Sequence, residues 1–304
     1  MSVERRRDAL RDEVLAAARP GGALLVPSFA VERTQELLVD LVALMESGAI
    51  PETPIFIDSP LATKASAIFK RHARELEDGA ALVRALEHRR VHFTESVEQS
   101  KALDRMRDFH VVIAASGMCE AGRIRHRLKN WLWREEGTVL LVGFQAQGTL
   151  GRILLDGASA VRIQGDDITV RARIRSLDLY SGHADATELV AWVEERLPIG
   201  HGLFLVHGEE QAMTALRARL SVALPQERIE APSLDAAYEF TPAGARLVET
   251  ERPRRVPDGS LGQLDWHNDL SRLFLDINEA VDRAADERAR GVILRRIRRA
   301  LEGT

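Results

Sequence analysis

The sequence predicts an α/β protein whose first domain is built on a parallel sheet. Short continuous apolar runs recur in the first half of the chain, and such runs are typical of strands buried on both faces. Each run is followed by a segment with helical spacing of apolar residues, and alternating strands and helices form parallel sheets. Beyond about residue 155, apolar and polar residues alternate with period two, which is typical of antiparallel strands. A second region with a different sheet is therefore expected there.

The first helix is predicted ahead of the first strand. Leu10, Val14 and Leu15 share one face of 4–19, and a Pro-Gly-Gly turn at 20–22 ends the helix. The next elements are predicted in this order: strand 23–27, helix 31–47, strand 54–57, helix 62–74, strand 110–115, helix 122–133 and strand 138–142.

In the second region, antiparallel strands are predicted at 161–163 and 168–175. They are followed by helix 186–197, strand 202–206 and helix 210–220. Pro253 and Pro257 indicate a linker, and apolar residues from Leu270 to Ala284 recur at helical spacing. The predicted regions are 1–155, 156–248, and a linker with a helical tail at 249–304.

Composition excludes several classes of protein. The 304 residues carry 42 basic and 46 acidic side chains, so the chain does not bind polyanions through its overall charge. No window holds the roughly 20 consecutive apolar residues of a membrane span, and the charged N-terminus is unlike a signal peptide, so no membrane partner is expected. The single cysteine, Cys119, excludes an internal disulfide and indicates a cytoplasmic protein, in which it is expected to be an idle buried thiol.

Polar residues directly after the predicted strands are the first candidates for a site, because ligands of open α/β sheets bind at the carboxyl ends of strands. These residues are Ser28, Asp58, Ser59, Ser116, Gly117, Gln145 and Thr149. The glycine-rich segment 143–151 opens a helix but lacks the Lys-Ser/Thr pair of a Walker loop and the dinucleotide-binding spacing. Thr149 is either a helix cap or a phosphate contact, and Ser116 is either a turn serine or a phosphate contact.

Two histidines stand at predicted element ends. His183 precedes a helix, and His207 follows a strand. They are either hydrogen-bonded structural residues or imidazoles brought to one edge for chemistry. The sequence contains neither His-x-His-x-Asp-His nor His-Glu-x-x-His, so it offers only part of a metal site.

Basic side chains gather locally, at Arg171 to Arg175, at Arg123 to Lys129 and in six arginines between Arg288 and Arg299. Each group is either a solvated face or a set of phosphate contacts. Aromatic residues make up 5% of the chain and are not interleaved with these groups, so base stacking is not expected.

Six collinear segments together resemble the β-CASP metallo-β-lactamase-fold nucleases, the family of ribonuclease J and of the mRNA 3′-end cleavage endonuclease. The resemblance runs from about residue 10 to residue 245. The segments are PSFAVERTQELL at 27–38, DSPLAT at 58–63, ASGM at 115–118 with Gly122 and Arg123, GFQAQGTLGR at 143–152, SGHAD at 181–185 and VHGE at 206–209.

The resemblance implies a β-CASP domain up to about residue 155. It implies the C-terminal part of a metallo-β-lactamase αββα fold, the RNA-specificity region, at 156–248. His183 then matches a histidine beside the scissile phosphate that acts as a proton donor, and His207 matches a zinc ligand typical of members that act on RNA. The resemblance implies that Ser116, Ser181 and Gly182 bind phosphates of the RNA. Gly117 and Thr149, from the strand-end candidates, are expected to bind phosphate as well. Asp58 and Ser59 are expected to line the substrate cleft.

The sequence departs from the family in one respect. The His-x-His-x-Asp-His half that provides most ligands of the two zinc ions is not present, so at most a partial zinc site and little or no catalysis by the isolated chain are expected. The leading hypothesis is the C-terminal portion of a zinc-dependent ribonuclease, with single-stranded RNA as substrate and an N-terminal half in cis or in trans. The alternatives are an inactive RNA-binding or scaffold relative and a remnant of a disrupted gene. The tail is expected to dock on the domain, to form a homodimer or to contact nucleic acid.

Overall fold

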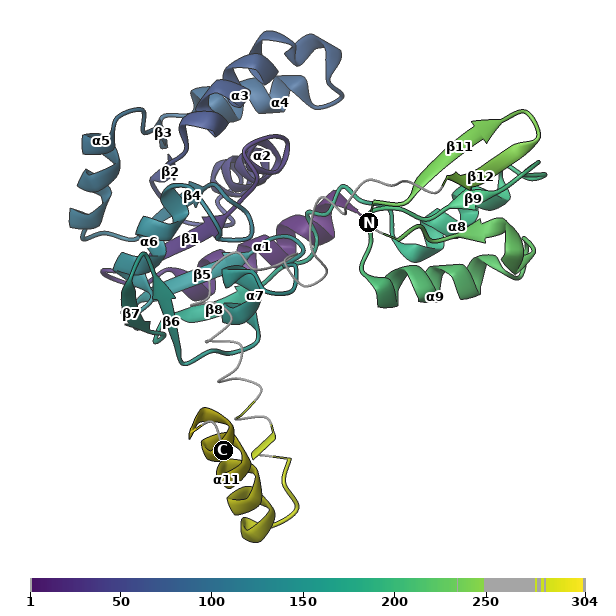
Figure 1. The fold of residues 1–304 in the computed structure, drawn as a ribbon. Helices are drawn as coiled ribbons and strands as arrows, with labels where there is room; N and C mark the ends of the chain where they lie inside the picture. Colours follow the sequence, from purple (N-terminus) through teal and green to yellow (C-terminus); the bar gives the residue numbers. More distant parts are fainter. Residues whose placement is uncertain (1, 234, 249–276, 278–279, 282, 303–304) are drawn as a thin grey trace. The chain divides into compact units, whose positions relative to one another are not determined.

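The computed structural model describes residues 2–233, 235–248, 277, 280–281 and 283–302 (Figure 1). Residue contacts group Met1–Ser181 and Gly262–Thr304 in one compact unit and Gly182–Leu261 in a second. The contacts of the first unit continue to Ser181. The boundary between functional regions near residue 155 stays a prediction.

A six-stranded sheet of order β3-β2-β4-β1-β5-β8 forms the centre of the first unit. All of its neighbouring strands are parallel, so the predicted α/β class is confirmed. Its strands are β1 Ala23–Pro27, β2 Ile55–Ile57, β3 Val91–Phe93, β4 His110–Ala114, β5 Gly137–Leu141 and β8 Arg173–Ser176.

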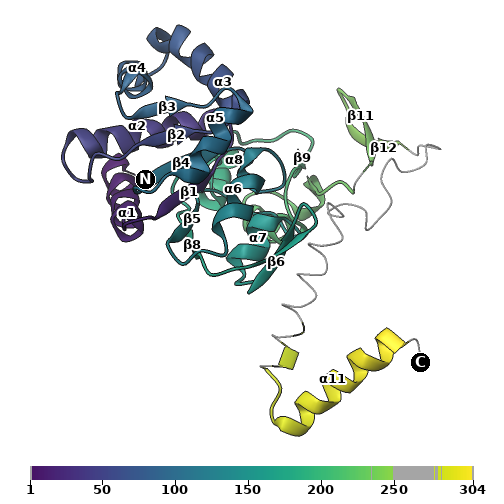
Figure 2. The same ribbon diagram turned by 90° about the vertical axis from the view of Figure 1, so that its left-hand side faces the viewer.

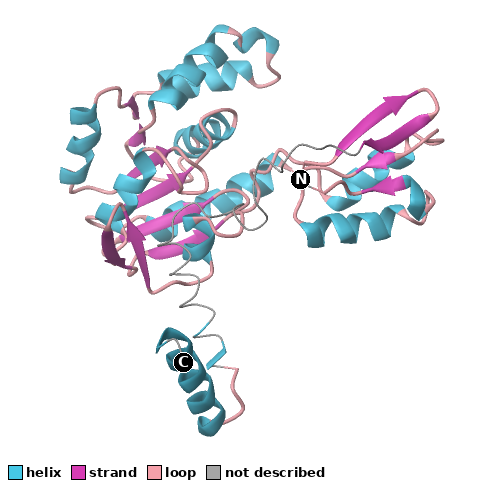
Figure 3. Cartoon of the chain, viewed as in Figure 1, coloured by secondary structure: helices cyan, strands magenta, loops and turns pink. Residues whose placement is uncertain are grey.

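Helices cover both faces of this sheet (Figure 3). The strand residues alternate between two apolar clusters, with Leu24 in one and Leu25 in the other. On the first face pack α1 Val3–Ala17, α2 Arg33–Glu46 and α4 Gly79–Glu87, and on the second α6 Arg123–Trp131 and α7 Leu150–Leu155. The first unit also contains α3 Pro60–Arg71 and α5 Val97–Ala102.

The segment after residue 155 corrects one prediction. Strands β6 Ala160–Ile163 and β7 Asp166–Thr169 form the expected antiparallel pair. The continuation at Arg173–Ser176 is not antiparallel, because it joins the large sheet parallel to β5 as its edge strand. Ile174 packs against the buried cluster, whereas the guanidinium of Arg175 reaches Glu13 at the surface with Nη2 2.6 Å from Oε1. An edge strand with one exposed side thus gives the same period-two pattern as an antiparallel strand.

The second unit is smaller and is built from short elements around Val193, Leu205, Leu220, Leu224 and Ile229. Helices α8 Ala186–Glu194 and α9 Glu210–Leu220 lie within the predicted ranges, and the predicted strand is reduced to β9 Leu203–Phe204. Strand β10 Ile229–Glu230 pairs with β9, and β11 Ala237–Thr241 forms a hairpin with β12 Gly244–Val248.

Of the tail, the structure describes mainly the helix α11 Glu287–Glu302, and the predicted helical positions from Leu270 to Phe274 lie outside the described residues. In the described part of the chain, no helix combines the length and apolar character needed to cross a bilayer.

His110, at the start of β4, makes the stability of the first unit sensitive to pH. The ring is 1% exposed, lies edge-on to Trp131 at 5.6 Å, and its Nδ1 lies 2.9 Å from the carbonyl oxygen of Asp108. Burial lowers the pKa of His110 below its usual value. As the pH falls below about 6.5, the unfolded chain therefore takes up a proton at this position before the native chain does, and the free energy of unfolding decreases.

His110→Phe is expected to reduce this pH dependence by up to about 1.4 kcal/mol per pH unit below the unfolded-state pKa. Urea unfolding at several pH values between 5 and 8 measures the slope, and His126→Phe, at an exposed ring, is the matched control. An unchanged slope in His110→Phe would show that other groups cause the dependence.

Candidate functional site at the strand ends

The carboxyl edge of the large sheet contains the predicted strand-end residues. Strands β1 and β4 are neighbours, yet the helices that follow them, α2 and α6, cover opposite faces of the sheet. The chain therefore leaves β1 and β4 toward opposite faces of the sheet, and open α/β sheets bind ligands at such a point. Ser28 begins the loop after β1 and Ser116 lies in the loop after β4.

Ser116 is half-buried and organises the loop after β4. Its Oγ accepts hydrogen bonds from the backbone N–H groups of Glu120 and Ala121, both at 3.2 Å. A hydroxyl that accepts two bonds can still donate its own hydrogen. The turn-serine interpretation is thus confirmed, and the hydroxyl retains the capacity to bind an anion.

Gly117 lies against the ring of Phe29. A Cβ at position 117 would lie 3.0 Å from two ring carbons of Phe29, a side chain that is 48% exposed. Glycine therefore lets the loop after β4 approach the loop after β1. The backbone of Gly117 is itself buried beneath this contact.

The glycine-rich segment after β5 is hydrogen-bonded to the loop after β4. Gln145 Nε2 donates to the carbonyl oxygens of Gly117 at 3.1 Å and of Gly143 at 2.9 Å. A Cβ at Gly151 would lie 1.8 Å from Gln145 Oε1, so a side chain there would displace Gln145. Thr149 Oγ1 donates to the carbonyl of Ala146 at 2.8 Å and accepts from the N–H of Arg152 at 3.3 Å, which confirms the predicted helix cap.

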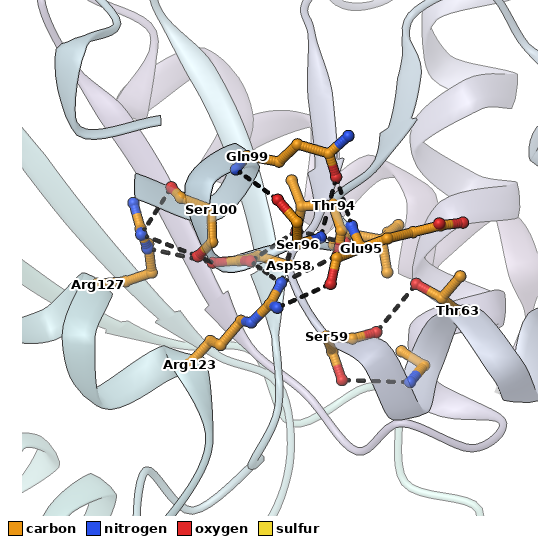
Figure 4. Close-up of polar contacts among 12 residues, drawn as sticks. Asp58, Ser59, Thr63, Thr94, Glu95, Ser96, Gln99, Ser100, Arg123 and Arg127 are labelled. Atoms are coloured by element: carbon orange, nitrogen blue, oxygen red, sulfur yellow. Dashed lines mark hydrogen bonds and ion pairs between the residues drawn. The ribbon is translucent and has the colours of Figure 1, made fainter. Parts of the chain in front are cut away.

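Asp58, directly after β2, has no exposed surface and is surrounded by four polar side chains (Figure 4). Its Oδ1 accepts from Thr94 Oγ1 at 2.6 Å and from Arg123 Nη1 at 3.0 Å. Its Oδ2 accepts from Ser100 Oγ at 2.9 Å and lies 3.2 Å from Arg127 Nε. A ligand would reach this carboxylate only after Arg123 or its neighbours had moved.

Ser59 caps the following helix, α3. Its Oγ accepts from the N–H of Ala62 at 3.2 Å, and its carbonyl accepts from Thr63 Oγ1 at 3.1 Å (Figure 4). Asp58 and Ser59 thus hold this edge of the sheet together, and their predicted place in a cleft stays a prediction.

Two arginines of α6 have a different role from the one the sequence suggests. Arg127 is buried, and besides Asp58 it binds Asp104 Oδ1 at 2.5 Å. Arg123 also donates to the carbonyl oxygens of Thr94 and Glu95, at 3.0 and 3.1 Å. Both guanidinium groups neutralise and orient internal oxygens, so neither belongs to a solvated face. The one feature of the sequence that indicates a shared partner is their spacing of four residues, which places both arginines on the same side of the helix.

The second unit carries the two candidate histidines, and both are exposed. His183 lies just before α8, whose first turn is fixed by Asp185: Oδ1 accepts from the N–H groups of Thr187 at 2.7 Å and Glu188 at 2.9 Å. These bonds, from Glu188 and from Thr187, lower the pKa of the Asp185 carboxyl. His207 follows β9 in a left-handed backbone conformation, with φ +62°. The sequence therefore predicted their positions at element ends correctly.

Ser181 is the last residue of the first unit and Gly182 the first of the second, and both are exposed. Among the residues that the structure describes, no group of three or more His, Cys, Asp or Glu side chains could hold a metal ion. Cys119 is fully buried, and burial raises its pKa, so the predicted idle thiol is confirmed.

Two family models match the chain in succession. The Beta-Casp domain matches residues 34–154, and the Zn-dependent metallo-hydrolase RNA specificity domain matches residues 167–232. The first match contains strands β2, β3, β4 and β5 of the large sheet with the Ser116 loop and the Asp58 cluster, and the second contains His183 and His207.

Curated relatives are similar over about two thirds of the chain. Ribonuclease TTHA0252 of Thermus thermophilus is 36% identical over 66% of this chain and 47% of its own length. Transcription termination factor FttA of Cenarchaeum symbiosum is 31% identical over 67% of this chain and 33% of its own. Endoribonuclease YSH1 of Candida glabrata is 27% identical over 71% of this chain and 29% of its own. The chain thus spans half or less of the length of these relatives.

Proposed function

Because the chain belongs to the β-CASP family of metallo-β-lactamase-fold nucleases, we propose that it forms the substrate-facing portion of a metal-dependent ribonuclease that cleaves single-stranded RNA. The observation that carries the proposal is the consecutive match of the two family models. One covers the sheet edge with Ser116 and the other covers the loops with His183 and His207. In this proposal the boundary between the two functional regions lies near residue 155, and the single buried cysteine supports a cytoplasmic location.

Each site residue is given the role that its surroundings support. Ser116 donates its hydroxyl hydrogen to a phosphate oxygen, and the buried Gly117 lets the Ser116 loop pack against Phe29. Ser181 and Gly182 provide exposed backbone for further phosphate contacts, whereas the buried Thr149 caps α7 and keeps the segment after β5 in place. His183 transfers a proton at the scissile phosphate, a role for which its exposed ring is accessible to substrate. Asp58 and Ser59 keep the loops of the cleft in place.

The described residues do not provide enough ligands to hold a metal ion. Zinc sites in hydrolases use three or more protein ligands, and the described residues do not form such a group. His207 alone would not retain zinc, since affinity comes from several ligands held together. We therefore assign His207 one ligand position that is completed by a metallo-β-lactamase half in cis or in trans.

Reconstitution tests this function. The chain alone, with excess Zn²⁺ or Mn²⁺, is expected to cleave a labelled single-stranded RNA weakly or not at all. The same chain fused behind a metallo-β-lactamase half that carries His-x-His-x-Asp-His is expected to cleave it, and EDTA is expected to stop the reaction. Strong cleavage by the chain alone would contradict the assignment of an incomplete metal site.

An RNA-binding protein without catalytic activity is the second candidate, and the lack of a three-ligand group among the described residues favours it. RNA binding without turnover in the fused protein would support this alternative. The two exposed histidines argue against it, because a protein that only binds RNA needs neither a proton donor nor a metal ligand.

A further inference from the structure

Helix α11 (yellow in Figure 2) differs in charge from the rest of the protein. Residues 287–302 contain six arginines and two glutamates, whereas the whole chain has a formal charge of −4. The helix has a defined beginning, because Asp286 Oδ1 accepts a hydrogen bond from the N–H of Ala289 at 2.7 Å. It lies beyond both segments matched by the family models.

The arginines are not spread evenly around α11. With about 100° of rotation per residue, Arg288, Arg295 and Arg299 fall within about 40° of one another and form a ridge along the helix. Neighbouring positions on this ridge are about 10 and 6 Å apart along the axis. Arg296 and Arg298 flank the ridge on either side, whereas Ile293 and Ile297 lie on the opposite side of the helix.

No ion pair joins these five arginines to any described residue, and all five are exposed. Arg290, on the apolar side, differs from them in donating to the carbonyl of Val281 at 3.3 Å. Like charges one turn apart destabilise a helix, and Arg295 and Arg299 are such a pair. A polyanion along the ridge would remove this repulsion.

We propose that the ridge Arg288–Arg295–Arg299 binds the phosphate backbone of RNA in addition to the residues assigned above to the scissile phosphate, a proposal that rests on the ribonuclease function above. Arginine is suited to phosphate because its planar fork donates two parallel hydrogen bonds. A nucleic acid is favoured over a lipid surface because residues 287–302 contain no Trp or Tyr, the residues that are enriched at membrane interfaces. The contact is independent of sequence and raises the local concentration of substrate.

Binding of a fluorescent 20-nucleotide oligouridylate to the full chain, followed by anisotropy at several KCl concentrations, tests the proposal. The variant Arg288→Gln/Arg295→Gln/Arg299→Gln is expected to bind about tenfold or more weakly near 0.1 M salt. Its slope of log affinity against log salt is expected to be smaller by about 2, since each single-strand phosphate contact contributes about 0.7. Glutamine preserves helix propensity, and circular dichroism verifies the helix.

The matched control is Arg71→Gln/Arg74→Gln/Arg84→Gln, which removes the same charge from exposed positions of the first unit. Wild-type affinity in this control is expected. Equal weakening in both variants would mean that RNA responds to total charge, and would overturn the proposal. So would ridge-dependent binding to phosphatidylglycerol vesicles combined with unchanged RNA affinity. Because the assay measures binding alone, a fused protein that binds through the ridge but does not cleave contradicts only the ribonuclease function.

Discussion

Asp58→Asn is expected to lower the free energy of unfolding of the chain by about 3–5 kcal/mol, the usual effect of removing one partner from a buried ion pair. The Asp58 carboxylate is fully buried between Arg123 and Arg127, whose side chains are 16% and 2% exposed. Without the negative charge, Arg127 keeps only Asp104 as an ion-pair partner, and Arg123 keeps the carbonyl oxygens of Thr94 and Glu95. Two guanidinium groups would then repel each other in a region with little water.

Urea denaturation followed by circular dichroism measures this change. Asp8→Asn is the matched control, because Asp8 pairs with Arg11 at 2.7 Å but its side chain is 62% exposed. Exposed pairs of this kind contribute about 0–1 kcal/mol. If Asp58→Asn were no more destabilised than Asp8→Asn, the cluster would not be what holds this edge of the sheet together.

The parts of the fold that the sequence predicted well are those with strong local patterns. Strands β1, β4 and β5 are fully buried, so each contains at least three consecutive apolar residues. Strand β3 has only three residues, one of them exposed, and the hairpin β11–β12 is largely exposed. Neither has an apolar run, so neither was predicted.

In the candidate site, too, the sequence predicted the residues that have a local pattern. Ser116, Thr149, His183 and His207 were found because strand and helix ends are visible in the sequence. The partners of Asp58 were not, because Thr94 and Ser100 lie 36 and 42 residues away and approach it only when β3 pairs with β2. A buried aspartate after a strand has the same sequence pattern as one that lines a cleft, and only the fold shows the arginines around it.

His207→Ala, made in the chain fused to a metallo-β-lactamase half, is expected to reduce RNA cleavage by about 100-fold or more. Even the residues that only orient metal ligands change affinity or activity by about 10- to 100-fold when replaced, and a ligand itself has a larger effect. If His207 holds a metal ion, the variant also retains less zinc after dialysis, which elemental analysis measures independently of activity.

His183→Ala separates the two roles. A proton donor is not a ligand, so this variant is expected to lose cleavage while its zinc content stays that of the unmodified fusion. His201→Ala, at an exposed histidine of the same unit, controls for the loss of an imidazole and is expected to change neither quantity. Loss of zinc in both His183→Ala and His207→Ala would make both side chains ligands and remove the proposed proton donor. Retention of zinc in both would place the metal entirely on the other half, and His207 would then contribute to RNA binding rather than to the metal site.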